Sequence, residues 1–281
     1  MSLSVLTIVK NRAGHLGQLV EGLRRSVVQP AELIIVDMAS APAVTLPDTA
    51  FPTTIISLSG GRLPLAAARN AAAQAATCDN LLFLDVDCIP MRDLVGVIDD
   101  QLRRTAGLIC AEAFYLSGAD ARGNWTEDEL LAVARPHPVR HFPTSGMREE
   151  ANAGLFWSLV FGIRRTQFDR LGGFDEAFSG YGAEDTDFGF RAKCAGIPLL
   201  FMGGPGAFHQ HHEVFDPPLP HIEDIVRNAQ LFFDRWKIWP MEGWLQAFGE
   251  EGLIWRDECQ IKLVRLPTAD EVAGARRLSA F

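Results

Sequence analysis

Short apolar runs alternate with amphipathic stretches over the first hundred residues of the chain. Runs rich in β-branched and aliphatic residues predict strands at residues 4–9, 33–36, 53–58 and 81–84. Apolar residues at helical spacing predict helices around residues 16–23, 64–76 and 94–102. The strands are apolar without alternation, which is typical of strands covered on both faces. The pattern therefore predicts an α/β fold with a mostly parallel central sheet flanked by helices.

The second part of the chain is less regular. Residues 118–150 show little periodicity and are expected to form an ordered loop or lid. Structure resumes over residues 154–212. Prolines at 217, 218 and 220 then break the chain before a helix with apolar residues at helical spacing from Ile222 to Trp236. We predict a main domain over residues 1–215, with halves 1–105 and 106–215, and a helical extension over 216–281 packed on it.

Composition and charge exclude several kinds of partner and location. The 281 residues are 48% hydrophobic and carry a formal net charge of -9, which makes nucleic-acid binding unexpected. The longest apolar runs are far shorter than the roughly 20 residues of a transmembrane helix, so at most peripheral membrane contact remains open. Five scattered cysteines without a CxxC pair, and the absence of a signal-peptide pattern, predict a cytoplasmic protein with reduced thiols.

Polar residues follow the predicted strands. Asn11, Asp37 and the pair Asp85 and Asp87 come directly after three of them, and the carboxyl ends of parallel strands meet at one edge of a sheet. Asp85 and Asp87 would point the same way in extended backbone and could approach one divalent cation, directly or through water. Alone, such a pair is also compatible with solvated or helix-capping aspartates.

Two later segments carry further candidate chemistry. In residues 171–191, glycines precede four acids, Asp175, Glu184, Asp185 and Asp187, which raise one another's pKa unless they cap a helix or face a cation or substrate. Residues 209–221 hold four of the seven histidines. Neutral imidazole beside carboxylates binds Mn²⁺ and only weakly Mg²⁺. These segments are candidates for a metal centre.

Seven motifs together resemble glycosyltransferases of the GT-A fold. They are TIVKNR (7–12), IIVD (34–37), AARN (67–70), LDVD (84–87), GGFDE (172–176), GAEDTD (182–187) and FHQ (208–210). The likeness is to family-2-like enzymes, including bacterial chondroitin polymerase domains, and to the C-terminal motif of animal β-1,4-galactosyltransferases. It covers about residues 3–215 and leaves out the loop at 118–150 and the tail.

The resemblance implies a role for each matching residue. It places Thr7, Asn11, Arg12 and Asp37 in the nucleotide pocket, Arg69 and Asn70 near the diphosphate or sugar, and Trp157 in the sugar pocket. It implies that Asp85 lies close to the ribose and metal, that Asp87 and His209 bind the metal, and that Glu184 and Asp185 form the acceptor-binding catalytic pair. Because the residues after His209 depart from the chondroitin enzymes, His211 competes with His209 as the ligand.

The resemblance implies a metal-dependent, inverting glycosyltransferase that moves a sugar from a nucleotide diphosphate, most simply UDP, to a saccharide or other hydroxyl acceptor. Mn²⁺ or Mg²⁺ would be the cofactor, and an aspartate such as Asp185 would take the proton of the attacking hydroxyl. Tyr181 and Ala183 stand where the galactosyltransferases carry Trp and Gly, which leaves donor and acceptor open. The alternatives are a haloacid-dehalogenase-like phosphatase, a nucleotidyltransferase and a non-catalytic sugar-nucleotide-binding module.

Overall fold

The computed structural model describes residues 3–59, 62–121 and 123–277. The strands of its central sheet are β1 (Leu3–Val9), β2 (Glu32–Asp37), β3 (Thr53–Ser57), β4 (Asn80–Leu84), β5 (Cys88–Pro90), β6 (Leu108–Tyr115), β7 (Arg135–Pro136), β8 (Met147–Glu149), β9 (Val160–Arg164) and β10 (Leu199–His209). The helices are α1 (Ala13–Arg24), α2 (Leu65–Ala75), α3 (Leu94–Arg104), α4 (Glu127–Val133), α5 (Arg165–Arg170), α6 (Glu184–Cys194), α7 (Ile222–Trp236), α8 (Glu242–Glu250) and α9 (Ala269–Ala275), with 3-10 turns at Ala153–Leu155 and Leu219–His221.

The sheet runs in the order β3-β2-β1-β4-β9-β6-β10-β5. Strand β1 pairs in parallel with β2 and with β4, and β2 pairs in parallel with β3. Strand β9 is antiparallel to both β4 and β6, and β10 is parallel to β6. Consequently β1, β2, β4, β6 and β10 all end at the same edge. The α/β architecture with a mostly parallel sheet is confirmed.

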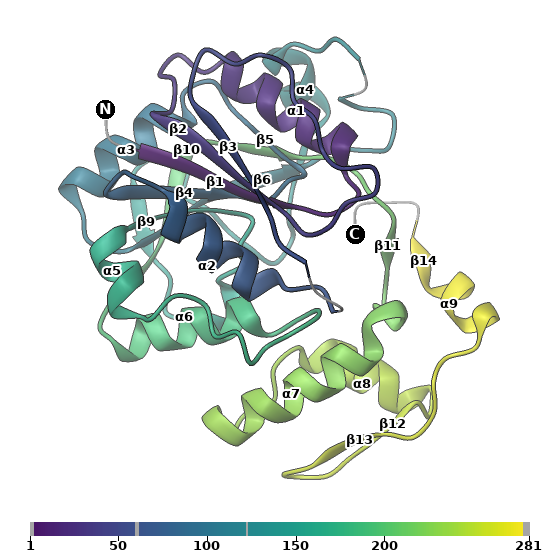
Figure 1. The fold of residues 1–281 in the computed structure, drawn as a ribbon. Helices are drawn as coiled ribbons and strands as arrows, with labels where there is room; N and C mark the ends of the chain where they lie inside the picture. Colours follow the sequence, from purple (N-terminus) through teal and green to yellow (C-terminus); the bar gives the residue numbers. More distant parts are fainter. Residues whose placement is uncertain (1–2, 60–61, 122, 278–281) are drawn as a thin grey trace.

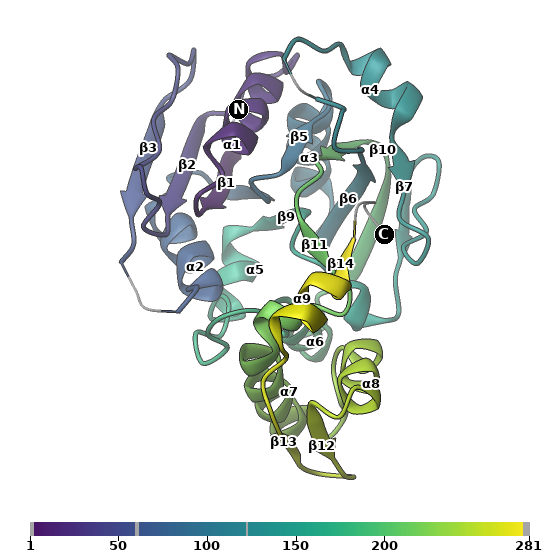
Figure 2. The ribbon, with the colours of Figure 1, turned by 90° about the vertical axis from the view of Figure 1, so that its right-hand side faces the viewer.

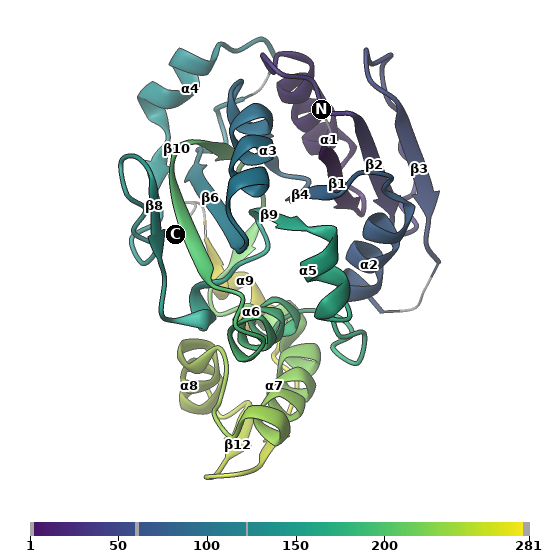
Figure 3. The ribbon, with the colours of Figure 1, turned by 90° about the vertical axis from the view of Figure 1, so that its left-hand side faces the viewer.

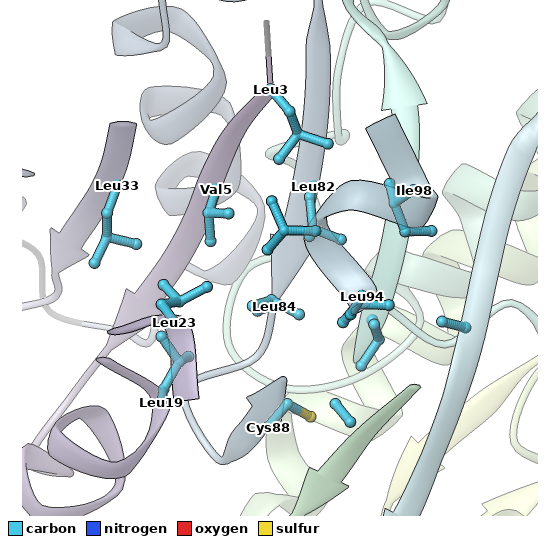
Figure 4. Packing of buried hydrophobic residues seen from close by; sticks show 14 of the residues in the cluster. Leu3, Val5, Leu19, Leu23, Leu33, Leu82, Leu84, Cys88, Leu94 and Ile98 are labelled. Carbon is cyan, nitrogen blue, oxygen red and sulfur yellow. The ribbon is translucent and has the colours of Figure 1, made fainter. Parts of the chain in front are cut away.

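Alternate residues of the strands enter two separate cores. Leu3, Val5 and Leu82 face α1 and α3, where they pack with leucines such as Leu23 and Leu94 (Figure 4). Leu6, Ile8 and Phe83 face the other way, toward α2, α5 and α6. Figures 1 and 3 show these helices on the two sides of the sheet. This double coverage explains why the central strands β1, β2 and β4 are mostly apolar, without alternation.

The segment from 118 to 150 is more ordered than its weak periodicity suggests. It contains α4, which begins with a capping box between Thr126 and Glu129. It also contributes β7 and β8 to the central sheet, against β6 and β10. The indole of Trp125 donates to Gln18 Oε1 in α1 at 2.6 Å. The expected role of residues 118–150 as a lid stays a prediction.

The C-terminal extension has a hydrophobic core of its own, built from α7, α8 and the hairpin of β12 (Ile254–Arg256) and β13 (Ile261–Leu263). It lies beyond α6, below the sheet in Figure 2. The extension is thus helical, as expected, but also includes two short antiparallel pairings. The second joins β11 (Val214–Phe215) to β14 (Arg276–Arg277). This pairing crosses the predicted domain boundary at residue 215, and the boundary itself stays a prediction. None of the helices in the described ranges is long and apolar enough to span a membrane.

Candidate metal centre and active site

The ends of β4 and β10 bring two of the sequence motifs together. Strand β5 follows the LDVD motif directly and pairs antiparallel with the end of β10, so that Cys88 lies opposite His209. The amide of Gln210 donates to the backbone oxygen of Asp87 at 2.7 Å. These backbone bonds fix Asp87 beside His209, although the two residues are far apart in the sequence.

Asp87 stands between two imidazoles. Its Oδ1 lies 3.4 Å from His209 Nε2, and its Oδ2 lies 3.4 Å from His212 Nε2. The three side chains form one cluster whose candidate ligand atoms are all within 4.8 Å of one another. Asp87 and His209 are buried and His212 is half-buried. The ring of Tyr115, at the end of β6, lies against that of His209 with centroids 4.6 Å apart.

This cluster fits a divalent transition-metal ion. Donor atoms that each lie about 2.1 Å from one ion are about 3.0 to 3.4 Å apart at octahedral or tetrahedral angles, close to the Asp87 to histidine distances seen here. Two imidazoles and one carboxylate suit Mn²⁺, Fe²⁺ or Zn²⁺ better than Mg²⁺, which prefers oxygen. The remaining coordination positions would be free for diphosphate oxygens or water.

The ligand set differs from the predicted one in two ways. His212 joins the cluster, whereas His211, the competitor considered for His209, does not. The backbone oxygen of His211 instead meets His15 Nε2 at 3.1 Å. Asp85 also lies outside the cluster, and its Oδ1 accepts the amide of Val86 at 2.8 Å. Its role as a ligand, directly or through water, stays a prediction.

The two aspartates differ in their electrostatic surroundings. Burial and the neighbouring charge of Asp87 raise the pKa of Asp85. Burial also opposes ionisation of Asp87, but His209, Arg12 and His212 outweigh it and lower the pKa of Asp87. Arg12 Nη1 donates to Asp87 Oδ2 at 2.5 Å. Asp87 is therefore the better anchor for a cation at neutral pH.

Two of the predicted nucleotide-binding residues hold a loop beside the sheet edge. Asp37 Oδ1 accepts the amide of Ser40 at 2.9 Å. Asn11, whose φ is 54°, donates its amide to Ser40 Oγ and accepts the amide of Ala41 through its side chain, both at 2.8 Å. These contacts shape the edge next to Arg12. Binding of uracil or ribose by these residues stays a prediction.

Arg69 lies between the LDVD motif, which carries Asp85, and the later pair Glu184 and Asp185. Its Nη1 donates to Glu184 Oε1 at 3.0 Å in an ion pair with both side chains buried. A cavity of about 10 Å³ is lined by Arg69 together with Thr7, Asp85 and Ser158. The hydroxyl of Thr7 is buried and makes no hydrogen bond to the described part of the chain. Folding thus brings the two acidic motifs to one place.

Glu184 and Asp185 occupy the first turn of α6, after Ala183 in a left-handed conformation (φ 71°). Burial and the charge of Asp185 raise the pKa of Glu184, although Arg69 opposes the rise. Burial also raises the pKa of Asp185, whose carboxylate is partly stabilised by Arg69 and by the amide of Thr186 at 2.7 Å. A carboxylate with a raised pKa is suited to accept a proton.

The other two acids of this segment have structural partners. Asp187 is fully buried and accepts hydrogen bonds from Arg191, Arg235 and Trp236. Asp175 pairs with the same Arg235 from α7. These contacts bind α6 to the extension. The resemblance set Glu184 and Asp185 apart, but the sequence contains no sign that Arg235, 48 and 60 residues further on, pairs with Asp187 and Asp175.

Two remaining predicted residues also have neighbours within the protein. The side chain of Asn70 donates to the backbone oxygen of Phe174 at 2.9 Å and accepts its amide at 2.8 Å, which fixes the glycine-rich loop against α2. Trp157 is half-buried, with Arg140 5.0 Å from its ring centroid and the ring of His137 edge-on at 4.8 Å. Their contact with donor or sugar stays a prediction.

Sequence reasoning missed His212 and Tyr115. Strand alternation places His209 and His211 on one face, which disfavours His212. Strand β10 ends at His209, however, so strand alternation does not extend to His211 and His212.

Two family models match the chain. The family model described as "Glycosyl transferase family 2" matches residues 4–172, and that described as "N-terminal domain of galactosyltransferase" matches residues 137–213. A validoxylamine A glucosyltransferase from Streptomyces hygroscopicus subsp. jinggangensis (strain 5008) is 46% identical over 58 residues. That match covers 21% of this chain and 14% of the relative.

Solved structures show the same fold at low sequence identity. S. aureus TarS is 14% identical with a TM-score of 0.56, over 82% of this chain and 39% of that chain. Its 1–349 fragment in complex with UDP is 15% identical with a TM-score of 0.54, and the match covers 83% of this chain and 66% of that chain. GalNAc-T7 with UDP, GalNAc and Mn²⁺ is 17% identical with a TM-score of 0.52, over 75% and 43%. The fold is GT-A, as the resemblance implied. Since the family model covers more than half of the chain, the protein belongs to glycosyl transferase family 2.

Proposed function

We propose that this protein is a metal-dependent, inverting glycosyltransferase that transfers a sugar from a UDP-sugar to a hydroxyl acceptor. The observation that carries the proposal is the cluster of Asp87, His209 and His212 at the sheet edge that also bears the Asp85, Arg69 and Glu184 group. UDP is the nucleotide in the complexes of TarS and GalNAc-T7. A family-2 match does not favour the phosphatase or the nucleotidyltransferase.

In this proposal, one group of residues binds the ion and the nucleotide of the donor, and a second group acts on the acceptor. Asp87, His209 and His212 would hold the ion, and Thr7, Asn11, Arg12 and Asp37 would line the nucleotide pocket. A bound divalent cation would neutralise charge on the leaving diphosphate. Asp185 would accept the proton of the attacking hydroxyl, and Glu184, held by Arg69, would orient the acceptor. Attack on the side opposite the leaving group would invert the anomeric configuration.

UDP binding should require a divalent cation, because Asp85, Asp87 and a diphosphate would otherwise concentrate negative charge at one place. Calorimetric titration with UDP in Mn²⁺, and again with excess chelator, measures this. We expect binding only with Mn²⁺, whereas equal affinity in both conditions would contradict a metal-dependent mechanism. Turnover across UDP-, GDP- and dTDP-sugars would then identify the donor, and its absence for every donor would favour a non-catalytic module.

His209 and His212 should both bind the ion, and His211 should not. The variants His209→Ala and His212→Ala are each expected to weaken Mn²⁺ binding by at least about tenfold, since even the loss of groups that only orient ligands costs about 10- to 100-fold. His211→Ala is the matched control and should bind Mn²⁺ as the unmodified protein does. Loss of affinity in His211→Ala, with no change in His212→Ala, would reject this ligand set.

A further inference from the structure

In the candidate metal centre, one carboxylate oxygen of Asp87 also forms an ion pair with Arg12. Asp87 Oδ2, which lies 3.4 Å from His212 Nε2, also accepts a hydrogen bond from Arg12 Nη1 at 2.5 Å. Asp87 is only 3% exposed in its side chain, whereas Arg12 is 34% exposed. The arginine thus reaches from the solvent-accessible start of α1 into the cluster and neutralises its only carboxylate.

A metal ion and this guanidinium cannot both keep their preferred positions. An ion held by the cluster would stand about 2 Å from a carboxylate oxygen, and a guanidinium hydrogen-bonded to that oxygen would be only a few ångströms from the ion. At such a separation a single and a double positive charge repel strongly in a partly buried site. A displaced guanidinium needs another anion, and a diphosphate offers the paired oxygens that arginine binds best.

We infer that Arg12 is a competing cation for the metal centre, which releases Asp87 to the ion when a nucleotide diphosphate becomes its new partner. Metal and nucleotide then bind cooperatively, and the ion alone binds weakly. The inference rests on the proposed function, in that it takes the ligand to be a nucleotide diphosphate. It adds a role for Arg12 that differs from simply lining the nucleotide pocket.

The test compares Mn²⁺ binding by the unmodified protein and by Arg12→Ala, titrated calorimetrically without and with saturating UDP. Without UDP, Arg12→Ala should bind Mn²⁺ about tenfold more tightly, because a charge-assisted hydrogen bond no longer competes with the ion for Asp87 Oδ2. With UDP present, that advantage should vanish or reverse. The factor by which UDP tightens Mn²⁺ binding should therefore shrink about tenfold or more.

Arg24→Ala is the matched control, because Arg24 is on the same helix and forms an exposed ion pair with Glu21. It removes the same charge and should leave Mn²⁺ binding unchanged, and thermal unfolding of both variants checks their fold. Weaker Mn²⁺ binding by Arg12→Ala without UDP would mean that Arg12 orients Asp87 for the ion, and would overturn the inference. Equal tightening with and without UDP, or no change, would also overturn it. If neither protein binds Mn²⁺ under any condition, the proposed metal dependence fails together with the inference.

Discussion

Replacing Asp185 by asparagine is expected to lower the rate of sugar transfer by about 10²- to 10⁴-fold, the usual contribution of general-base catalysis. The amide keeps the size of the side chain but cannot accept the proton of the acceptor hydroxyl. Mn²⁺-dependent UDP binding should remain nearly intact, since Asp185 is not part of the Asp87, His209 and His212 cluster. Initial rates of transfer and calorimetric UDP titrations measure the two effects separately.

The pH profile gives a second readout of the same residue. Burial raises the pKa of Asp185, so its basic form is lost as the pH falls through that raised value. The rate should therefore decline on the acidic side of neutrality for the unmodified protein, and the part of this decline that is due to Asp185 should be absent in Asp185→Asn. Near-normal turnover by Asp185→Asn, together with loss of activity in Glu184→Gln, would move the base to Glu184. A product that keeps the donor's anomeric configuration would reject the inverting mechanism.

Replacing Asp187 by alanine should destabilise the protein by about 3–5 kcal/mol, the usual cost of removing one partner from a buried ion pair. Asp187 is fully buried and accepts from Arg191 Nε at 2.7 Å, Arg235 Nη1 at 2.6 Å and Trp236 Nε1 at 2.9 Å. The substitution leaves these donors without their carboxylate and weakens the junction between α6 and α7. Urea unfolding followed by circular dichroism measures the change.

Asp175→Ala is the matched control for that experiment. Asp175 pairs with the same Arg235, but its side chain is 28% exposed and the pair faces solvent. Its removal should cost no more than about 1 kcal/mol, as exposed pairs usually do. Equal destabilisation by the two variants would show that burial of Asp187 does not govern the junction.

The sequence by itself determined the order of elements. Strands such as β1 and β4 are apolar enough to be recognised singly, because burial on both faces leaves few polar positions in them. A helix starting near Glu184 was one interpretation of the acids there, since acids favour the first turn of a helix. The motifs around Asp87 and His209 were recognisable because, together with five others, they resemble those of GT-A glycosyltransferases. Local patterns carried all of this information.

Tertiary structure alone decided which of the candidate residues meet. The short pairing of β5 with β10 puts Asp87 beside His209, and beyond the end of β10 it is His212, not His211, that lies in the cluster. Strand alternation does not apply beyond the end of the strand. The resemblance had already set Glu184 and Asp185 apart, but only the fold pairs Glu184 with Arg69, and Asp187 and Asp175 with Arg235. Burial makes such long-range charge pairing energetically decisive, and a single sequence contains no local signal for it.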